Sequence, residues 1–331
     1  MVMVNMDGII PCLDDSSRCR SSVSDFILLG FSSGQRMELL LLVDFQVIIL
    51  EALLGSSLLN VLVGTDSQLH MPMYFFLANL SFLDIGCANT TMPQLLFHFL
   101  SRKKRLSYAG SLTQMYIFLF LGITKCILYA MTAYHRYVAI CNPLLYHSLM
   151  NKRACVRMAA GIWFGASLHS LIHTVFVMRL PYCNVKEINH FFCEIPTLMK
   201  LSCSDISTYE TVIFVSGIVL LLIPSTIILS SYTCILSSVL RMSSVKGMQK
   251  ALATCSSHLT VVVLFYGAAI FMYMRPSSYH TPEEDKMVSM FYTIVTPVLN
   301  PLIYTLRNRD VLATLRTLVG KCIVCQKRGY E

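Results

Sequence analysis

The sequence predicts an all-α membrane protein, a seven-transmembrane helix bundle with a short amphipathic C-terminal helix. The first reason is composition: 55% of the 331 residues are hydrophobic and only 13% are charged, whereas an ordinary soluble domain is about a quarter charged. The second is that long apolar stretches recur along the whole chain. The third is the stretch 287–306, which carries no formal charge and yet contains Pro297 and Pro301.

Seven stretches can each cross a bilayer, since a helix needs about 20 apolar residues to span the hydrocarbon core. They are 39–63, 72–97, 108–134, 155–178, 209–240, 252–274 and 287–306. The first is too long and lies too deep for a cleaved signal peptide, so we interpret it as a signal anchor. Without repeats or Gly/Ser linkers, the chain is predicted to form one unit: an N-terminal segment (1–38), the bundle (39–306), and a helix and tail (307–331).

The last stretch contains a predicted weak point. A transmembrane helix tolerates proline only where neighbouring helices, side chains or water satisfy the freed backbone groups. The element Asn300-Pro301-x-x-Tyr304 therefore predicts a hinge inside a packed helix. A hinge in a membrane helix suggests a bundle that switches between states.

Charge alone does not orient the bundle. If the C-terminus is inside, thirteen Lys and Arg residues lie on the inner side and twelve on the outer side, so the positive-inside rule does not decide. Cysteines give a further clue, because Cys183, Cys193 and Cys203 follow one another at ten-residue intervals between the fourth and fifth stretches. This spacing predicts a disulfide-bearing loop outside the cytosol.

Several short motifs occur in order along the chain. They are FILLGF at 26–31, MPMYFFL at 71–77, AYHRYVAIC at 133–141, SY at 231–232, KALATCSSHL at 250–259 and PVLNPLIY at 297–304. Together they resemble the olfactory receptor family of class A (rhodopsin-like) G-protein-coupled receptors. The resemblance covers roughly residues 24–315.

The resemblance implies a multi-pass protein of the plasma membrane with an extracellular N-terminus. It also implies a small volatile organic ligand bound in the outer half of the bundle, and a heterotrimeric G protein, of the olfactory stimulatory class, that raises cyclic AMP. No enzyme motif stands out in the chain, and neither a cofactor nor a nucleic-acid partner is expected.

The inner end of the third stretch carries Arg136, which can snorkel to the interface. In the family such an arginine closes the inner face and then contacts the G protein. The alternative is an arginine that only sets topology, with the tyrosines as interfacial belt residues. The residues that the resemblance assigns to coupling and activation are His135, Arg136, Tyr137, Tyr232, Asn300, Pro301 and Tyr304.

Asp84 lies midway along the second stretch, and an intramembrane carboxylate is costly and usually functional. In the family it forms a polar centre with an acid of the third stretch. Lys125 stands in place of that acid here. We therefore expect Asp84 and Lys125 to form a buried pair.

The resemblance also implies a ligand site that is apolar with a few orienting hydroxyls, which suits small organic molecules. Phe118 stands where amine receptors carry an aspartate, so an amine ligand is not expected. Several members of this set could serve only in packing. The predicted lining comprises Met115, Phe118, Leu119, Gly122, Ile123, Ser216, Leu220, Tyr266, Ile270, Tyr273 and Thr293.

The chain departs from the family pattern at several places. Ser111 replaces the family's disulfide cysteine, which leaves Cys193 over while Cys183 and Cys203 can still pair. Residues 1–38 contain no Asn-x-Ser/Thr sequon. The other departures are Lys125 for the acid, His135 for the aspartate before Arg136, and Ser56 for an asparagine.

These departures leave an alternative open, a signalling-deficient remnant of the same fold. A membrane transporter is a second alternative, although the interrupted fifth and seventh stretches do not mirror one another as transporter repeats do. The leftover thiol allows two interpretations. His190, Cys193 and Glu194 could bind copper or zinc, or Cys193 could simply be free or mispaired.

Overall fold

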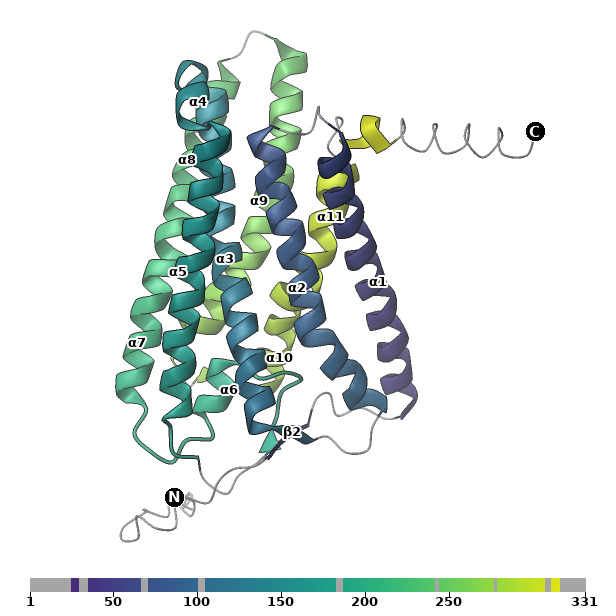
Figure 1. Cartoon of the computed structure of the whole chain (residues 1–331), viewed down its shortest axis with the longest axis vertical. Helices are drawn as coiled ribbons and strands as arrows, with labels where there is room; N and C mark the ends of the chain where they lie inside the picture. Colours follow the sequence, from purple (N-terminus) through teal and green to yellow (C-terminus); the bar gives the residue numbers. More distant parts are fainter. Residues whose placement is uncertain are drawn as a thin grey trace, which may run out of the picture.

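A computed structural model of the chain describes residues 25–29, 35–66, 71–100, 105–182, 187–241, 244–276, 279–306 and 311–315. Long helices run side by side and form one bundle (Figure 1). The long helices are α1 (Gln35–Thr65), α2 (Pro72–Leu100), α3 (Tyr108–Cys141), α5 (Lys152–Met178) and α9 (Val245–Tyr273). Two further helical rods each consist of three consecutive segments. The first comprises α7 (Ser207–Gly217), η2 (Ile218–Leu222) and α8 (Ile223–Leu240), and the second comprises α10 (Pro282–Met290), η4 (Phe291–Val295) and α11 (Thr296–Leu306).

These seven rods coincide with the seven predicted stretches. Six of them are long and apolar enough to cross a membrane. The seventh, α2, carries Asn79, Asp84 and Asn89 along its length. It packs against α1, α3 and α11; Asp84 is fully buried among these helices, Asn79 is half-buried and Asn89 is exposed.

Polar caps begin several rods just outside the apolar stretches. Ser107 Oγ accepts a hydrogen bond from Gly110 N at the start of α3 (3.1 Å), and Asn151 Oδ1 accepts one from Ala154 N at the start of α5 (2.8 Å). Such caps satisfy backbone donors that the helix itself leaves free. Each cap therefore helps to define where the helix begins.

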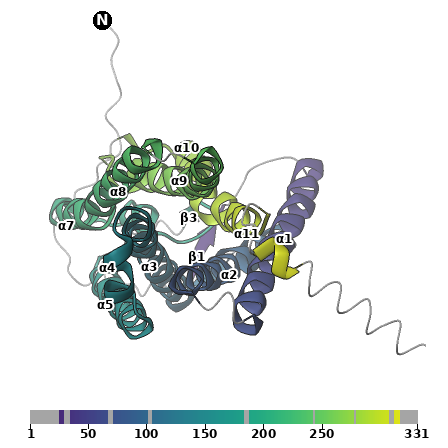
Figure 2. The same ribbon diagram turned by 90° about the horizontal axis from the view of Figure 1, so that it is seen from above.

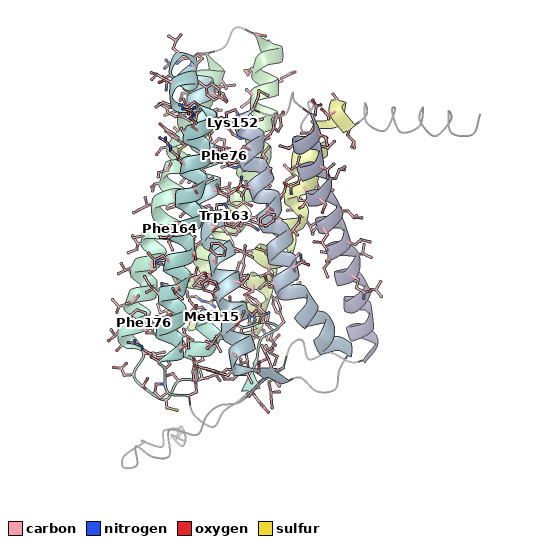
Figure 3. The ribbon with its side chains drawn as sticks, viewed as in Figure 1. Phe76, Met115, Lys152, Trp163, Phe164 and Phe176 are labelled. Atoms are coloured by element: carbon pink, nitrogen blue, oxygen red, sulfur yellow. The ribbon has the colours of Figure 1, made fainter. Side chains whose placement is uncertain are left out.

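The third helix is the most enclosed element. It packs against α2, α5 and α8, and Figure 2 shows it surrounded by its neighbours. The outer faces are apolar instead: Phe164 and Phe176 of α5 are 74% and 45% exposed, and Figure 3 shows them on the outside of the bundle. These faces suit contact with lipid chains.

A small sheet covers one end of the bundle, here called the strand end. Its order is β2 (Arg105–Ser107), β1 (Asp25–Leu28), β3 (Glu187–Ile188); β1 pairs antiparallel with β2 and parallel with β3. Phe26 of β1 is fully buried and packs against Tyr108 and Tyr182. The opposite end, called the Arg136 end, carries α4 (Pro143–Leu149) (Figure 1).

The predicted weak point at Asn300-Pro301 lies inside helix α11, which continues through Pro301. The wider π-helical turn is η4, which precedes Pro297; a similar turn, η2, precedes Pro224. Proline lacks an N–H and clashes with the preceding turn, so a wider turn before it relieves the clash. Beyond α11, residues 311–315 are helical, in the region of the expected amphipathic C-terminal helix.

Candidate functional site

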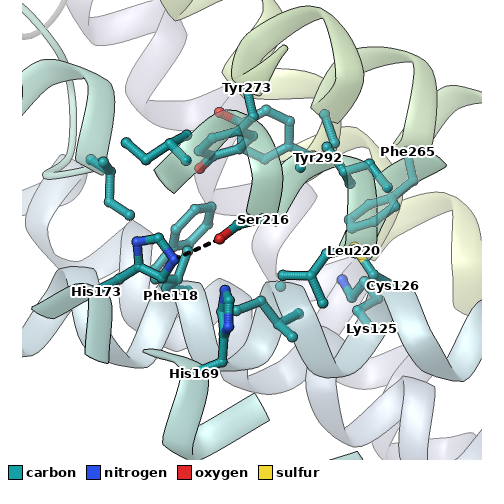
Figure 4. A pocket seen from close by; sticks show the side chains of 18 of the residues that line it. Phe118, Lys125, Cys126, His169, His173, Ser216, Leu220, Phe265, Tyr273 and Tyr292 are labelled. Atoms are coloured by element: carbon teal, nitrogen blue, oxygen red, sulfur yellow. Dashed lines mark hydrogen bonds between the residues drawn. The ribbon is translucent and has the colours of Figure 1, made fainter. Parts of the chain in front are cut away.

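The bundle contains a cavity of about 90 Å³. Its walls come from α2, α3, α5, α7, η2, α9 and η4, and Figure 4 shows the side chains that converge on it. Short helix α6 (Ile195–Met199) contributes Ile195 from the strand end. Phe192, which precedes α6 in the same loop, is fully buried with its ring 4.7 Å from that of Phe118. This loop, whose residues 187–206 lie between α5 and α7 and which is here called the closing loop, therefore packs against one side of the cavity.

Seven of the eleven residues predicted to bind ligand line this cavity: Phe118, Leu119, Gly122, Ile123, Ser216, Leu220 and Tyr273. Four do not. Met115 is buried in a separate apolar cluster nearer the strand end, and Ile270 packs against the main core. Tyr266 donates to Cys126 O (2.6 Å) and Thr293 donates to Ser289 O (2.6 Å). The first two side chains therefore pack in the core, and the other two hydrogen-bond to backbone carbonyl groups.

Many residues that line the cavity were not predicted from the sequence. His169 and His173 of α5 are spaced i, i+4 and so share one face of the helix, a signal that was present in the sequence. No comparable signal marked the remaining residues, which are Cys87, Lys125, Cys126, Ile195, Ile213, Gly217, Leu221, Phe265, Ala269 and Tyr292.

Most polar groups on the wall already have protein partners. His173 is bonded at both nitrogens, Nδ1 to Tyr209 Oη (3.1 Å) and Nε2 to Ser216 Oγ (3.2 Å). The ring of His169 lies beside that of His173, with centroids 4.6 Å apart and the planes tilted by 53°. The cavity therefore offers ligands mainly apolar surface.

Glu194 holds two of the wall tyrosines from the closing loop. Its carboxyl accepts hydrogen bonds from Tyr292 Oη (2.8 Å), Tyr273 Oη (3.4 Å) and Ser289 Oγ (3.2 Å). Burial raises the pKa of Glu194 to about 7. The loop is thereby tied to α9, α10 and η4 around a carboxyl that titrates near neutral pH.

His190 lies beside Glu194, with Nε2 3.4 Å from Oε1. Burial lowers the pKa of His190 to about 3. The imidazole is neutral near neutral pH, and its Nε2 makes no hydrogen bond within the described residues. The approach is thus a contact between polar atoms and not an ion pair.

The predicted pair of Asp84 and Lys125 is confirmed. Lys125 Nζ lies 2.6 Å from Asp84 Oδ1, and both side chains are fully buried. Asn300 Nδ2 donates to Asp84 Oδ2 (2.7 Å) and to Tyr129 Oη (2.9 Å). Helices α2, α3 and α11 therefore meet at one charged, hydrogen-bonded centre.

Arg136 is 6% exposed at the other end of α3. Its guanidinium hydrogen-bonds the Cys255 thiol and lies near Tyr232 and His258, which bond to each other through Tyr232 Oη and His258 Nδ1 (2.5 Å). Tyr232 is therefore buried in this cluster. His135 Nε2 bonds instead to Tyr146 Oη of α4 (3.0 Å).

The remaining residues predicted to act in coupling and activation are Tyr137, Pro301 and Tyr304. Tyr137 is half-buried and its ring tilts against that of Tyr134. Pro301 is buried in α11. The side chain of Tyr304 lies outside the described part of the chain, as do the N-terminal residues 1–24.

The two described cysteines of the closing loop differ in their bonding. Cys203 is disulfide-bonded, while its predicted partner Cys183 lies outside the described residues. Cys193 is free and fully buried, and its thiol hydrogen-bonds Ser111. Burial raises the pKa of Cys193 to about 12.

The suggested metal site is not supported. Among the described residues, no three His, Cys, Asp or Glu side chains come together as metal ligands would. Cys193 turns toward Ser111, and Glu194 toward the tyrosines. The three side chains share a loop but not a site.

Comparison with known proteins agrees with this architecture. The family model described as "Olfactory receptor" matches residues 45–322. The chain belongs to the olfactory receptor family. It is 50% identical over 295 residues to olfactory receptor 2T5 of Homo sapiens, covering 89% of this chain and 94% of that protein. Olfactory receptor 2T27 of Homo sapiens and olfactory receptor 2V1 of Mus musculus are each 47% identical, covering 92% of this chain and 96% of each relative.

The olfactory receptor family is a family of G-protein-coupled receptors and not of enzymes. Two groups of residues in this receptor then have a natural interpretation. The cavity residues of α3 run from Phe118 to Cys126, and Arg136 lies further along the same helix, toward the end that carries α4. Lys125 of the polar centre lies between them on this helix.

Proposed function

We propose that this receptor binds a small apolar odorant in the cavity between α3, α5, α7, η2, α9 and η4. The observation that carries the proposal is a mostly apolar cavity inside the bundle whose polar wall groups are largely satisfied by the protein. Such a site favours small organic molecules over ions or sugars. The strand end then faces outside the cell, with the receptor in the plasma membrane.

The Arg136 end is the proposed docking face for a heterotrimeric G protein. Arg136, Tyr232 and His258 form a buried cluster between α3, α8 and α9. Opening this cluster would free a cationic side chain to bind the G protein, which then raises cyclic AMP. The bond from His135 to Tyr146 ties α4 to the same helix.

A cavity-filling variant tests the ligand site. A Cβ placed on Gly122 meets nothing within 4 Å, because the cavity lies there. Gly122→Leu should fill part of that space and raise the half-maximal odorant concentration by about tenfold or more. Gly161→Leu is the control, since Gly161 of α5 is exposed, has open space and does not line the cavity.

Cyclic AMP should be recorded over an odorant panel at matched surface amounts of receptor. Equal responses of the Gly122→Leu and Gly161→Leu variants would contradict the site. A surface-expressed receptor that never raises cyclic AMP, although odorants shift its thermal unfolding, would instead indicate the signalling-deficient alternative.

A further inference from the structure

Lys125 belongs to two sites that the sequence treats as separate. It pairs with Asp84 at the polar centre, and it also lines the ligand cavity. Figure 4 shows it at one end of the group of lining side chains, near Cys126 and Phe265, with His173 at the other end. Its Nζ lies 5.8 Å from the centroid of the Phe265 ring. A charged donor therefore stands at the end of an apolar cavity.

The hydrogen-bonding capacity of this ammonium is not exhausted. An ammonium has three N–H donors and no acceptor. Within the part of the chain that the structure describes, the one oxygen that Lys125 is seen to bond is Asp84 Oδ1. Lys125 also hydrogen-bonds the Cys87 thiol, a weak acceptor, which leaves one N–H facing Cys126 and the ring of Phe265 on the cavity wall.

The other end of the cavity lacks a comparable donor. Both nitrogens of His173 are engaged, and the hydroxyls of Tyr273 and Tyr292 are bonded to Glu194. His169 remains as a polar wall residue beside His173. A ligand with one polar group thus has a strong donor at the Lys125 end and an imidazole at the His173 end.

We propose that Lys125 donates a hydrogen bond to a carbonyl oxygen of the ligand, so that the receptor selects small apolar ketones and esters over hydrocarbons of the same shape. A carbonyl oxygen accepts without donating, which matches a donor-only ammonium. A buried donor left without an acceptor costs free energy that a matching ligand recovers. This inference rests on the proposed function and names the ligand class for the same cavity.

The proposal also gives the ligand a route to the rest of the receptor. The carbonyl oxygen shares the ammonium with Asp84, and Asp84 is bonded to Asn300 of α11. Ligand binding then changes the strength of a contact that joins α2, α3 and α11. An apolar molecule of the same size fills the cavity without making this change.

The test compares matched ligands on purified full-length receptor. The probes are a series of straight-chain methyl ketones and, for each ketone, the alkene in which C=CH₂ replaces C=O. Binding is measured as ligand-induced stabilisation in thermal unfolding, which needs no signalling. A hydrogen bond to a charged donor predicts about a tenfold or greater preference for the ketone over its alkene.

The decisive variant is Lys125→Met combined with Asp84→Asn, which removes both charges together and leaves neither unpaired. We expect it to bind ketone and alkene equally. His169→Leu is the matched control on the opposite end and should keep the ketone preference. The inference is overturned if no ketone binds, if the double variant keeps the preference, or if His169→Leu abolishes it.

Failure of the inference and failure of the proposed function are distinguishable. If the Gly122→Leu variant loses odorant responses while the ketone preference is absent, the cavity is the ligand site and only the role of Lys125 is wrong. If the Gly122→Leu variant binds and responds normally, the ligand site itself lies elsewhere.

Discussion

At the scale of single residues, Ser111 and Cys193 meet where the olfactory receptor family carries a disulfide. Cys193 is free and its thiol hydrogen-bonds Ser111. Ser111→Cys should therefore allow a bond between α3 and the closing loop. A disulfide that closes a long loop typically stabilises by about 2–4 kcal/mol.

We expect the Ser111→Cys receptor to lose the free thiol of Cys193 and to unfold at a higher temperature. The check is peptide mass analysis without reduction, together with thermal unfolding with and without reductant. Ser111→Ala is the control, because it removes the hydroxyl without adding a thiol. A Ser111→Cys receptor with two free thiols would refute the expected geometry.

Glu194 and His190 make opposing contributions to stability as pH changes. The folded-state pKa of Glu194 is raised from 4.5 to about 7, so its contribution is complete below 4.5 and is lost as pH rises to about 7. The pKa of His190 is lowered from 6.5 to about 3, so its contribution is complete above 6.5 and is lost as pH falls. The two effects offset each other between 4.5 and 6.5.

Single substitutions should separate these effects. Glu194→Gln leaves only His190, so the unfolding temperature should fall as pH is lowered from 6.5. His190→Gln leaves only Glu194, so the unfolding temperature should rise as pH is lowered from about 7. Thermal unfolding across this range is the measurement. Parallel pH profiles for the two variants would show that neither group is coupled to folding in this way.

At the scale of helices, the close approach of α1 and α11 depends on a glycine. A Cβ on Gly55 would lie 2.8 Å from Pro301 Cβ, and the proline ring cannot turn aside. Gly55→Ala should therefore destabilise the receptor by about 1–3 kcal/mol, in spite of the higher helix propensity of alanine.

Gly64 provides a control on the same helix, because a Cβ there meets nothing within 4 Å. Gly64→Ala should leave stability unchanged or slightly raised, by up to about 1 kcal/mol. Thermal unfolding and the yield of monodisperse receptor would be compared for both variants. Equal stability of Gly55→Ala and the unmodified receptor would mean that α1 can shift without cost.

Elements differ in how far their sequence predicts them. The seven rods follow from hydropathy, which is a local property of each stretch. The sheet was not predicted, because β1, β2 and β3 are two to four residues long and pair across large separations in the chain. The wide turn η4 was also not predicted, since the sequence marks Pro297 and Pro301 alike and the turn precedes only Pro297.

At the scale of the whole receptor, the residues of the cavity could be predicted only in part from the sequence. The pair of Lys125 and Asp84 could be predicted, because the family resemblance places residue 125 opposite Asp84 and charges inside a membrane are usually paired. The sequence did not show that Lys125 also reaches the cavity, nor that α5 supplies His169 and His173 to it. Those facts depend on how each helix is rotated about its axis. Packing against the other helices sets this rotation, and the order of residues within one helix does not.

The Lys125–Asp84 pair should be coupled in stability because it joins three helices through Asn300. Lys125→Met alone leaves a buried carboxyl without its cation, and Asp84→Asn alone leaves a buried ammonium without its anion. Removing one partner of a buried pair typically costs about 3–5 kcal/mol, whereas replacing both can be nearly neutral. We therefore expect each single variant to lower the unfolding temperature and the yield of folded receptor strongly. The double variant should recover most of both. A double variant as unstable as the two single losses added together would show that the charges contribute independently and that the pair does not hold α2, α3 and α11 together.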